Sequence, residues 1–296
     1  MAGIGAALAA MGGTGLGTVM YAHFIEPAAI GLRVYRLPAA GLRHDLSIAH
    51  ISDLHLRDDR YWRRKLVKTR AIFSCLAPDL VLLSGDFLEC DNGLPLLEDL
   101  LSRLAPRFGM FAVWGNHDYY HYSFWHLFAP LVHQSRDRDH EHLAERMTAA
   151  GVTILHNRCV ALDTFAGRLA LFGVSDCYSH KDDLPRAMED PPAADYRILL
   201  THSPQLVNHV PRDTVDLLLA GHTHGGQIRL PGWGALASRS DLPAHMIRGC
   251  FMRNGMTVII GNGLGEGRFV PFRLNCPPEV TWIRLAAAPS VDARVR

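Results

Sequence analysis

The sequence predicts an α/β fold in which two β-sheets pack face to face and helices cover the outside. Short apolar runs bounded by turn residues recur along the chain, and such runs are typical of strands buried on both faces. In the first half of the chain, stretches of helical length separate these runs. Alternation of strand and helix indicates an α/β protein.

The elements are expected in the following order. Five apolar runs that close on a polar cluster predict strands at 46–56, 78–86, 109–118, 197–203 and 215–224. Helices are expected at about 60–76, 93–105 and 140–150. Further apolar runs come with fewer helices between them, namely VTILHN (152–157), RLALFGVSD (168–176), TVIIGNG (257–263) and EVTWIRL (279–285). These later runs predict a second, more antiparallel sheet.

The composition limits the class of protein. The chain has 296 residues, of which 48% are hydrophobic and 20% are charged. This is the composition of a globular protein with a sizeable core, and it excludes long disorder, a coiled coil and a polytopic membrane protein. The formal net charge of +1 gives no global electrostatic argument for nucleic acid binding. Seventeen histidines are a high number, and histidine is the commonest metal ligand.

The two ends of the chain differ from the middle. Residues 1–25 contain no Lys, Arg, Asp or Glu, and their length suits one membrane span, although six glycines lower the hydrophobicity of residues 1–20. A membrane anchor or export remnant and a surface-packed helix are both consistent with this pattern. Residues 26–45 are expected to form a lead-in segment. Residues 287–296 are expected to be a disordered tail.

Each of the five apolar runs ends in residues that can bind a metal ion, and the carboxyl ends of strands are where α/β folds place their sites. These residues are Asp53, His55, Asp86, Asn116, His117, Asp118, His202, His222 and His224. Oxygen and nitrogen donors without a thiolate suit two divalent ions such as Mn²⁺, Fe²⁺ or Zn²⁺. Singly, each motif has a simpler explanation, such as a turn or a core histidine. Together, in this order, they favour a shared metal centre.

The ordered set D-x-H, GD, GNHD, H and GHTH resembles the calcineurin-like metallophosphoesterase superfamily. Three longer segments narrow the resemblance, namely GHTHGGQIRLPGWG (221–234), IIGNGLGEG (259–267) and PFRLNCPPEVTWIRL (271–285). They are similar to the bacterial YkuE/YaeI-type phosphodiesterase branch, which is itself similar to UDP-2,3-diacylglucosamine pyrophosphatases. The resemblance implies a four-layer αββα fold and a metallophosphoesterase domain over residues 46–286.

The resemblance also implies a role for each site residue. The ligands of one ion would be Asp53, His55, Asp86 and His224, and those of the other would be Asp86, Asn116, His202 and His222. Asp86 would bridge both ions. His117 would face the phosphate and donate a proton or hydrogen bond to the leaving oxygen. Asp118 would orient His117, because a carboxylate can fix the tautomer of an imidazole.

Two further segments each allow two interpretations. The basic segment 57–70 fits a solvated helix face, or an electropositive rim that draws anionic substrates or membrane head groups towards Asp53. The aromatic insert 119–131 fits the packing of an extra helix, or an amphipathic lid over the metals that contacts a lipid or the membrane interface.

The sequence therefore predicts a dinuclear metal-dependent phosphoesterase that hydrolyses a phosphodiester or pyrophosphate bond by means of a hydroxide that bridges the metals. A lipid-linked substrate and association with the inner membrane of a bacterium are the finer expectations. The alternatives are a broad-specificity phosphodiesterase or nuclease, a non-catalytic metal-binding scaffold, and a cytoplasmic location. The near-neutral charge argues against duplex nucleic acid as a partner.

Overall fold

The first sheet takes its strands from both ends of the chain. The computed structural model describes residues 15–122, 136–238 and 240–288. Across this sheet the strands are β1 (Gly31–Ala39), β16 (Glu279–Ala287), β2 (Leu46–Ile51), β3 (Leu80–Ser84), β4 (Met110–Val113) and β7 (Val152–Ile154). Strands β2, β3, β4 and β7 are parallel, whereas β16 is antiparallel to β2. The expected lead-in, 26–45, therefore supplies an edge strand, since β1 pairs with β16.

The second sheet has a parallel centre. Across it the strands are β14 (Gly249–Arg253), β15 (Met256–Ile260), β11 (Leu217–Ala220), β10 (Tyr196–Thr201), β9 (Gly167–Val174) and β8 (Arg158–Thr164). The four inner strands are parallel, and the edge strands β14 and β8 are antiparallel to their neighbours. As expected, the second sheet has more antiparallel pairs than the first, two of five against one of five. Its centre is nevertheless parallel, and short elements such as α6 (Leu184–Ala187) make the crossovers and leave little helical signal. The runs at 152–157 and 279–285 form strands of the first sheet instead.

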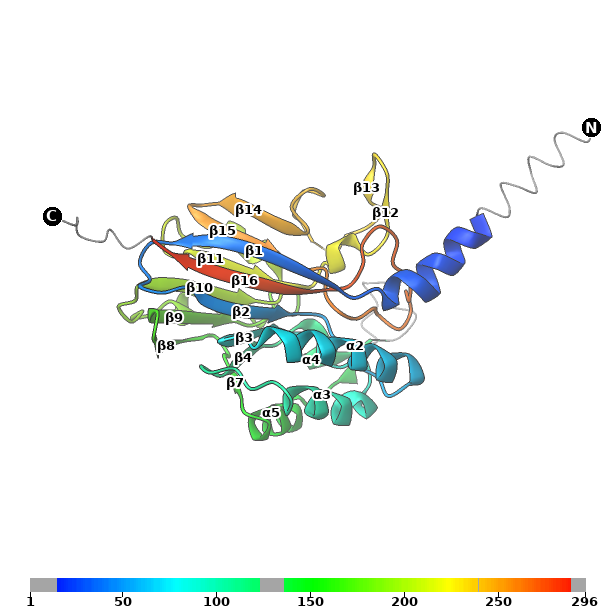
Figure 1. Ribbon diagram of the computed structural model, residues 1–296, viewed down its shortest axis with the longest axis horizontal. Coiled ribbons are helices and arrows are strands. Elements are labelled where there is room, and N and C mark those ends of the chain that lie inside the picture. The colour runs from blue at the N-terminus through cyan, green and yellow to red at the C-terminus, as the bar shows by residue number, and fades with distance from the viewer. Residues whose placement is uncertain (1–14, 123–135, 239, 289–296) are drawn as a thin grey trace, which may run out of the picture.

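The two sheets pack face to face, as predicted (Figure 1), and the central strands β3, β4, β10 and β11 bury both of their faces. In β3, Leu80 and Leu82 face the second sheet, and they share a core cluster with Ile198 and Leu217 from β10 and β11. The alternate side chain Val81 belongs to a second cluster, on the helical side of the sheet. Because successive side chains of a strand point to opposite faces, a run of apolar residues fills both layers.

Three helices cover the outer face of the first sheet (Figure 1): α2 (Arg60–Leu76), α3 (Leu94–Leu101) and α5 (His140–Ala149). Helix α2 begins after Asp59, whose carboxylate accepts a hydrogen bond from the backbone N–H of Trp62 at 2.7 Å and so caps the helix. Trp62, Leu66 and Phe73 repeat at helical spacing and are buried. All three helices lie close to their predicted positions.

The amino-terminal segment projects from the body of the protein (Figure 1). Residues 15–20 are helical and continue into a π-helical turn, Tyr21–Ile25, and a 3-10 turn, Glu26–Ala28. Within the described residues, no helix combines the length and the apolar character that crossing a membrane requires. The rest of the predicted 1–25 segment lies outside the described residues.

The remaining elements are short. A pair of two-residue strands, β5 (Tyr120–His121) and β6 (Arg136–Asp137), closes one loop, and β12 (Arg229–Leu230) pairs with β13 (Gly234–Ala235) in a hairpin. Most of the aromatic insert 119–131 falls outside the described residues, as do residues 289–296 of the predicted tail.

Candidate metal centre

The carboxyl ends of five strands bring the predicted residues to one place. The loops that follow β2, β3, β4, β10 and β11 carry them, in chain order, as Asp53 and His55, then Asp86, then Asn116, then His202, then His222 and His224. The two sheets contribute side by side, so residues separated by up to 171 positions meet. This is where α/β sheets place their ligands.

The backbone at this place is strained in a way that marks a function. Five of these residues, Asp53, His55, Asp86, His222 and His224, have φ between 45° and 67°, in the left-handed region that side chains other than that of glycine rarely adopt. Each such residue costs on the order of 1 kcal/mol or more, and such residues cluster at sites where the strain serves a purpose. Here the strain turns the side chains towards one another.

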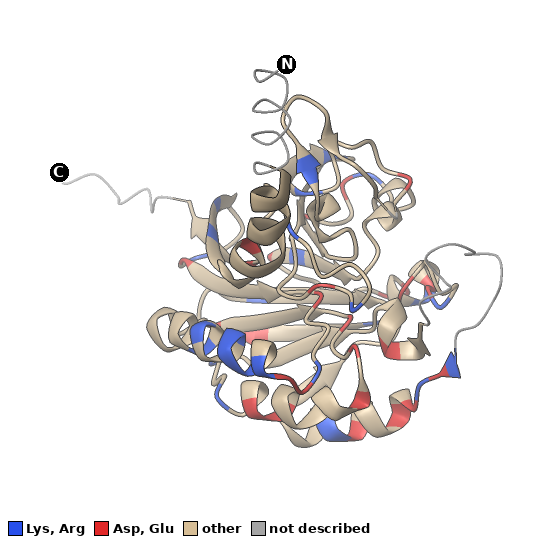
Figure 2. Cartoon of the chain, turned by 90° about the vertical axis from the view of Figure 1, so that its right-hand side faces the viewer, with Lys and Arg blue, Asp and Glu red and all other residues tan. Residues whose placement is uncertain are grey.

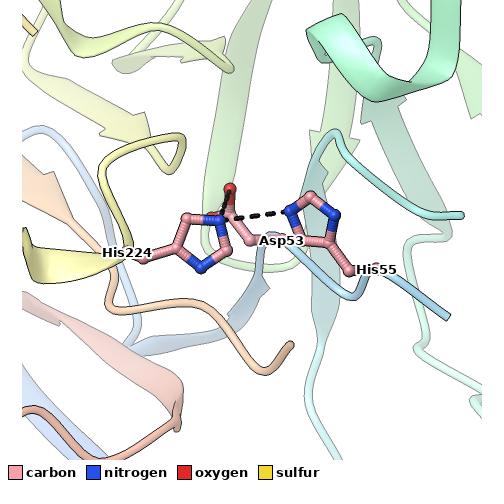
Figure 3. A group of neighbouring side chains, drawn as sticks. All are labelled: Asp53, His55 and His224. Carbon is pink, nitrogen blue, oxygen red and sulfur yellow. Dashed lines mark hydrogen bonds and ion pairs between the residues drawn. The ribbon is translucent and has the colours of Figure 1, made fainter. Parts of the chain in front are cut away.

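One group consists of Asp53, His55 and His224 (Figure 3). Nε2 of His55 lies 3.1 Å from Nε2 of His224, which in turn lies 3.6 Å from Oδ1 of Asp53. The far nitrogens have partners: Nδ1 of His55 contacts Glu89 at 2.9 Å, and Nδ1 of His224 contacts the carbonyl of Gly265 at 3.2 Å. Since both partners are acceptors, each Nδ1 carries the proton, and the two Nε2 lone pairs point at each other.

A second group repeats this pattern around Asn116, His202 and His222. Nε2 of His202 lies 3.1 Å from Nδ1 of His222, which lies 3.2 Å from Oδ1 of Asn116. Nδ1 of His202 donates to the carbonyl of Ser84 at 2.7 Å, so its Nε2 presents a lone pair. In both groups two ring nitrogens therefore face each other at 3.1 Å, an arrangement that a shared proton or a metal ion satisfies.

Asp86 lies between the two groups. Its Oδ2 is 3.4 Å from Nε2 of His55 and also 3.4 Å from Nε2 of His202. Burial opposes charge on Asp86, but the imidazoles of His202 and His117 outweigh burial and hold the pKa of Asp86 well below its ordinary value. A charged carboxylate thus sits at equal distances from the two sets of ring nitrogens.

The protons of the side chains are distributed accordingly. Burial alone would lower the pKa of His55, but the hydrogen bond that it donates to Glu89 and the charge of Asp86 raise it. Burial and the neighbouring His55 lower the pKa of His224 well below its ordinary value. The two shifts oppose each other within the pair, so a divalent ion that binds there competes with a proton for the ring nitrogens.

This donor set fits two divalent ions. It offers buried carboxylates, an amide oxygen and imidazole nitrogens whose second nitrogens are fixed by hydrogen bonds, as in metal sites in general. Nitrogen ligands of one ion, with bonds of ~2.1 Å, lie about 3 Å apart, which agrees with the 3.1 Å between the facing nitrogens of each pair.

His117 stands at the mouth of this centre. Its ring packs edge-on against His55 at 4.5 Å and against Tyr122 at 4.6 Å, and its side chain is 19% exposed. It lines a pocket of about 140 Å³ together with His55, Asp86 and His224. Burial lowers the pKa of His117 to about 4, against the opposing charge of Asp86. A substrate in the pocket would meet this imidazole beside the ligand groups.

Asp118 has a different neighbourhood from the predicted one. Its carboxylate accepts backbone hydrogen bonds at 2.8 Å from each of Asp86, Phe87 and Gly115. The carboxylate 3.6 Å from Nδ1 of His117 belongs to Glu89. The predicted pairing of Asp118 with His117 is therefore corrected, because adjacent residues of helix α4 (Asn116–Tyr119) do not face each other. Asp118 instead holds the loop that carries Asp86.

Two carboxylates outside the predicted set, Glu89 and Asp176, also contact the centre. Burial raises the pKa of Glu89, but the hydrogen bond from His55 and the charges of His117 and His55 together outweigh burial and lower that pKa to about 2. Asp176 accepts a hydrogen bond from Ser203 and lies in a group with His202 and His222. Asp176 stands just after the end of β9, whereas Glu89 stands in no recognisable motif, so the sequence offered no signal for Glu89.

Comparison with known proteins agrees with this geometry. The calcineurin-like phosphoesterase family model matches residues 46–226, and the chain belongs to this family. The resemblance inferred from the motifs is thereby confirmed, and the chain is a hydrolase of the metallophosphoesterase class.

Three relatives illustrate the range of the family. YkoQ of Bacillus subtilis, named an uncharacterized metallophosphoesterase, is 30% identical over 83% of this chain and 84% of that protein. Phosphodiesterase YaeI of Escherichia coli is 30% identical over 90% of this chain and 92% of that protein. UDP-2,3-diacylglucosamine pyrophosphatase LpxG of Chlamydia trachomatis is 27% identical over 92% of this chain and 94% of that protein.

Proposed function

We propose that the chain hydrolyses a phosphodiester or pyrophosphate bond with two divalent metal ions held by the two groups around Asp86. The observation that carries this proposal is the pair of histidine contacts at 3.1 Å, in each of which two ring nitrogens face each other beside Asp86. One ion would be held by Asp53, His55, Asp86 and His224, and the other by Asp86, Asn116, His202 and His222. Asp86, equidistant from both groups, would be shared.

The bound ions would neutralise phosphate oxygens and lower the pKa of an attacking water molecule. The residues of the chain do the rest. Asp53 and Asp86 supply the buried negative charge that makes cation binding favourable. The imidazoles complete the ligand set without further negative charge, so the pocket remains attractive to an anion.

His117 is the residue proposed to assist the leaving group. In hydrolysis, a bond from the water oxygen to phosphorus forms, the bond to the leaving oxygen breaks, and that oxygen takes up a proton. The partly exposed ring of His117 lines the same pocket as the ligands, which suits it to donate this proton or a hydrogen bond. Glu89, 3.6 Å from Nδ1 of His117, would orient the ring.

The substrate is proposed to be lipid-linked and the protein to act at the inner membrane. LpxG, one of the relatives, is named a pyrophosphatase of a diacylglucosamine nucleotide, and the exposed apolar residues of the amino-terminal helix favour the same setting. A broad-specificity phosphodiesterase is the second candidate, favoured by the relative named phosphodiesterase YaeI.

Two diester substrates test the chemistry. With Mn²⁺ added, the wild-type protein is expected to hydrolyse bis-p-nitrophenyl phosphate and, more slowly, a diester with a poorer leaving group. The variant His117→Gln is expected to lose about 10²-fold or more on the poor leaving group and less on p-nitrophenolate, which needs little protonation. Equal losses on both substrates would contradict the role of His117, and wild-type turnover that survives complete chelation would contradict the proposed metal dependence.

The lipid-linked substrate is tested separately. We expect purified protein with Mn²⁺ to release products from a nucleotide-linked acyl sugar or a phospholipid pool, as followed by mass spectrometry. If it cleaves only soluble cyclic or aryl diesters, the broad-specificity candidate holds instead.

A further inference from the structure

A second cavity lies beside the metal pocket. It has a volume of about 470 Å³ and is lined by the amino-terminal segment, by helix α2 and by the start and end of the loop 266–271. Glu266 and Pro271 line this cavity, whereas residues 267–270 line the metal pocket. One loop thus separates the two cavities. The volume is in the range that accommodates small ligands.

The rim of this cavity is positively charged. Arg60, Arg64 and Lys68 follow one another at intervals of four residues, so they lie on one face of α2, and all three are exposed. Within the described part of the chain, no ion pair engages any of them. Like charges at this spacing disfavour a helix by a few tenths of a kcal/mol each. An anionic ligand on the rim would remove that repulsion.

The other charges of the cavity are already neutralised. Nζ of Lys65 lies 2.9 Å from Glu266, and Nε of Arg57 lies 2.6 Å from Asp59. The positive charge available to a ligand therefore comes from the rim. Apolar residues also line the cavity, namely Phe24, Pro27, Ala28 and Pro271. A ligand that combines an anionic phosphate group with an apolar body would match this lining.

Exposed apolar side chains surround the cavity. Phe24 is 59% exposed, and it belongs to a series on one short helix: Leu16, Val19, Met20, Tyr21, Phe24 and Ile25. Figure 2 shows the contrast with α2, which carries a band of Lys and Arg, whereas residues 15–25 carry none. Large exposed apolar groups beside a basic band are typical of helices that lie in a membrane interface.

The β12–β13 hairpin adds to this apolar surface. Trp233, near its tip, is 85% exposed. The backbone N–H of Arg229, at the base of the hairpin, donates to Leu274 at 2.9 Å, and the N–H of Arg273 donates to Ala22 of the helical segment at 2.8 Å. Hairpin and helix are therefore joined to the same stretch of chain, and they project at the same end of the protein in both views (Figures 1 and 2).

We propose that this cavity binds the phosphate headgroup of an anionic phospholipid, while the apolar side chains of residues 16–25 and of the hairpin enter the bilayer. A second copy of the chain fits less well, because a symmetric contact would bring two basic rims together. The bilayer would then lie beside the loop 266–271, next to the metal pocket. This docking goes beyond the proposed function, since it requires no hydrolysis.

Vesicle flotation with the full chain tests the proposal. Binding to vesicles of phosphatidylcholine with phosphatidylglycerol is expected to exceed binding to phosphatidylcholine alone and to weaken with added salt. The double variant Arg60→Gln/Arg64→Gln is expected to bind roughly 25-fold more weakly, at about fivefold for each cation removed. The control Arg63→Gln/Arg103→Gln removes the same charge from positions outside the cavity, where Arg63 pairs with Asp58 and Arg103 with Asp99. It should bind nearly as the wild type does.

Two further measurements separate the outcomes. Trp233→Ser is expected to weaken binding without changing its preference for the anionic lipid. All variants should hydrolyse a soluble diester at the wild-type rate, so a failure of the proposed chemistry would be seen independently. Equal binding to both kinds of vesicle, or equal loss in the Arg60/Arg64 variant and its control, would overturn the headgroup site. Glycerol phosphate is added to the flotation assay as a soluble competitor. If millimolar glycerol phosphate releases the protein from the vesicles as fully as an excess of unlabelled vesicles does, docking on a bilayer is overturned in favour of a free phosphate ligand.

Discussion

Two buried clusters of charged side chains lie side by side in this protein, and they differ in how their hydrogen bonds are completed. In one, Glu266 accepts from Lys65 at 2.9 Å and from Arg273 at 2.8 Å. Arg273 also donates to the backbone carbonyls of three loop residues at 2.7–3.0 Å, namely Asn262, Gly265 and Cys276. In the other, around Asp86, nitrogen lone pairs face each other.

The comparison teaches that burial of charge alone does not mark a site. The Glu266 cluster is satisfied within the chain, so it needs no ligand, whereas the Asp86 cluster is satisfied only when cations join it. The two also touch: the carbonyl of Gly265 accepts from Arg273 and lies 3.2 Å from Nδ1 of His224. The satisfied cluster thus holds the ring of His224 in the other cluster in place.

The largest effect is expected for Asp86→Asn. This change keeps the shape of the side chain but removes the negative charge between the two groups. We expect kcat/KM on bis-p-nitrophenyl phosphate to fall by about 10³-fold or more, since metal-assisted stabilisation is worth several kcal/mol. The matched control is Asp45→Asn, whose carboxylate pairs with Arg284 at the surface and should leave the rate unchanged. Activity within tenfold of the wild type would contradict a role for Asp86 in the metal centre.

The next effect is on stability. Arg273→Met leaves Glu266 with one cation fewer and several carbonyl groups without a donor, so the free energy of unfolding in urea should fall by about 3–5 kcal/mol. In Arg284→Met the lost partner is Asp45, and the side chains of that pair are 55% and 32% exposed. Little or no change in the free energy of unfolding is expected there. Similar values for the two variants would contradict the contrast between buried and exposed pairs.

A smaller effect is expected for Glu89→Gln. This carboxylate fixes the proton of His55 on Nδ1 without itself lying between the facing nitrogens. Affinity for Mn²⁺, measured by calorimetric titration, should fall by about 10- to 100-fold, as is usual for a residue that orients a metal-binding histidine. Glu98→Gln, at a surface pair with Arg146, is the control. An unchanged affinity in both variants would show that His55 needs no such support.

The smallest effect concerns a buried imidazole outside the centre. His50 contacts Ser84 at 2.8 Å, and burial lowers its pKa to about 3. Below pH 6.5 the unfolded chain takes up a proton at His50 and the folded chain does not. The free energy of unfolding therefore decreases as the pH is lowered from 6.5 to about 3, by up to about 1.4 kcal/mol per pH unit. The slope between pH 6 and 5 should be shallower in His50→Gln, but not in the exposed control His44→Gln. An identical slope in His50→Gln would contradict this account.

Much of the centre was predictable because its residues follow apolar strands directly. A strand buried on both faces is recognisable in the sequence as an apolar run. The polar residue that ends the strand, such as Asp86 or His202, is recognisable with it. The parallel centre of the second sheet could not be predicted, because its crossovers are short turns. The pairing of His117 was also missed, because the direction of a side chain on one turn of helix depends on the backbone.

The supporting residues were beyond sequence reasoning for a related reason. Arg273 lies in PFRLNCPP, a segment without periodicity, and its acceptors are carbonyls whose directions follow from the folded loop. Glu89 looks like any loop carboxylate in the sequence. Both became recognisable only when hydrogen bonds could be counted around a buried group.

The most direct test of the account is the number of metal ions that the chain binds. Chelator-treated protein titrated with Mn²⁺ in a calorimeter, in two buffers of different protonation enthalpy, should bind two ions per chain and release protons as it does so. Asp86→Asn should bind at least one ion fewer or far more weakly. Wild-type protein that binds no ion, or binds ions equally well without Asp86, would contradict the claim that this carboxylate joins two metal-binding groups.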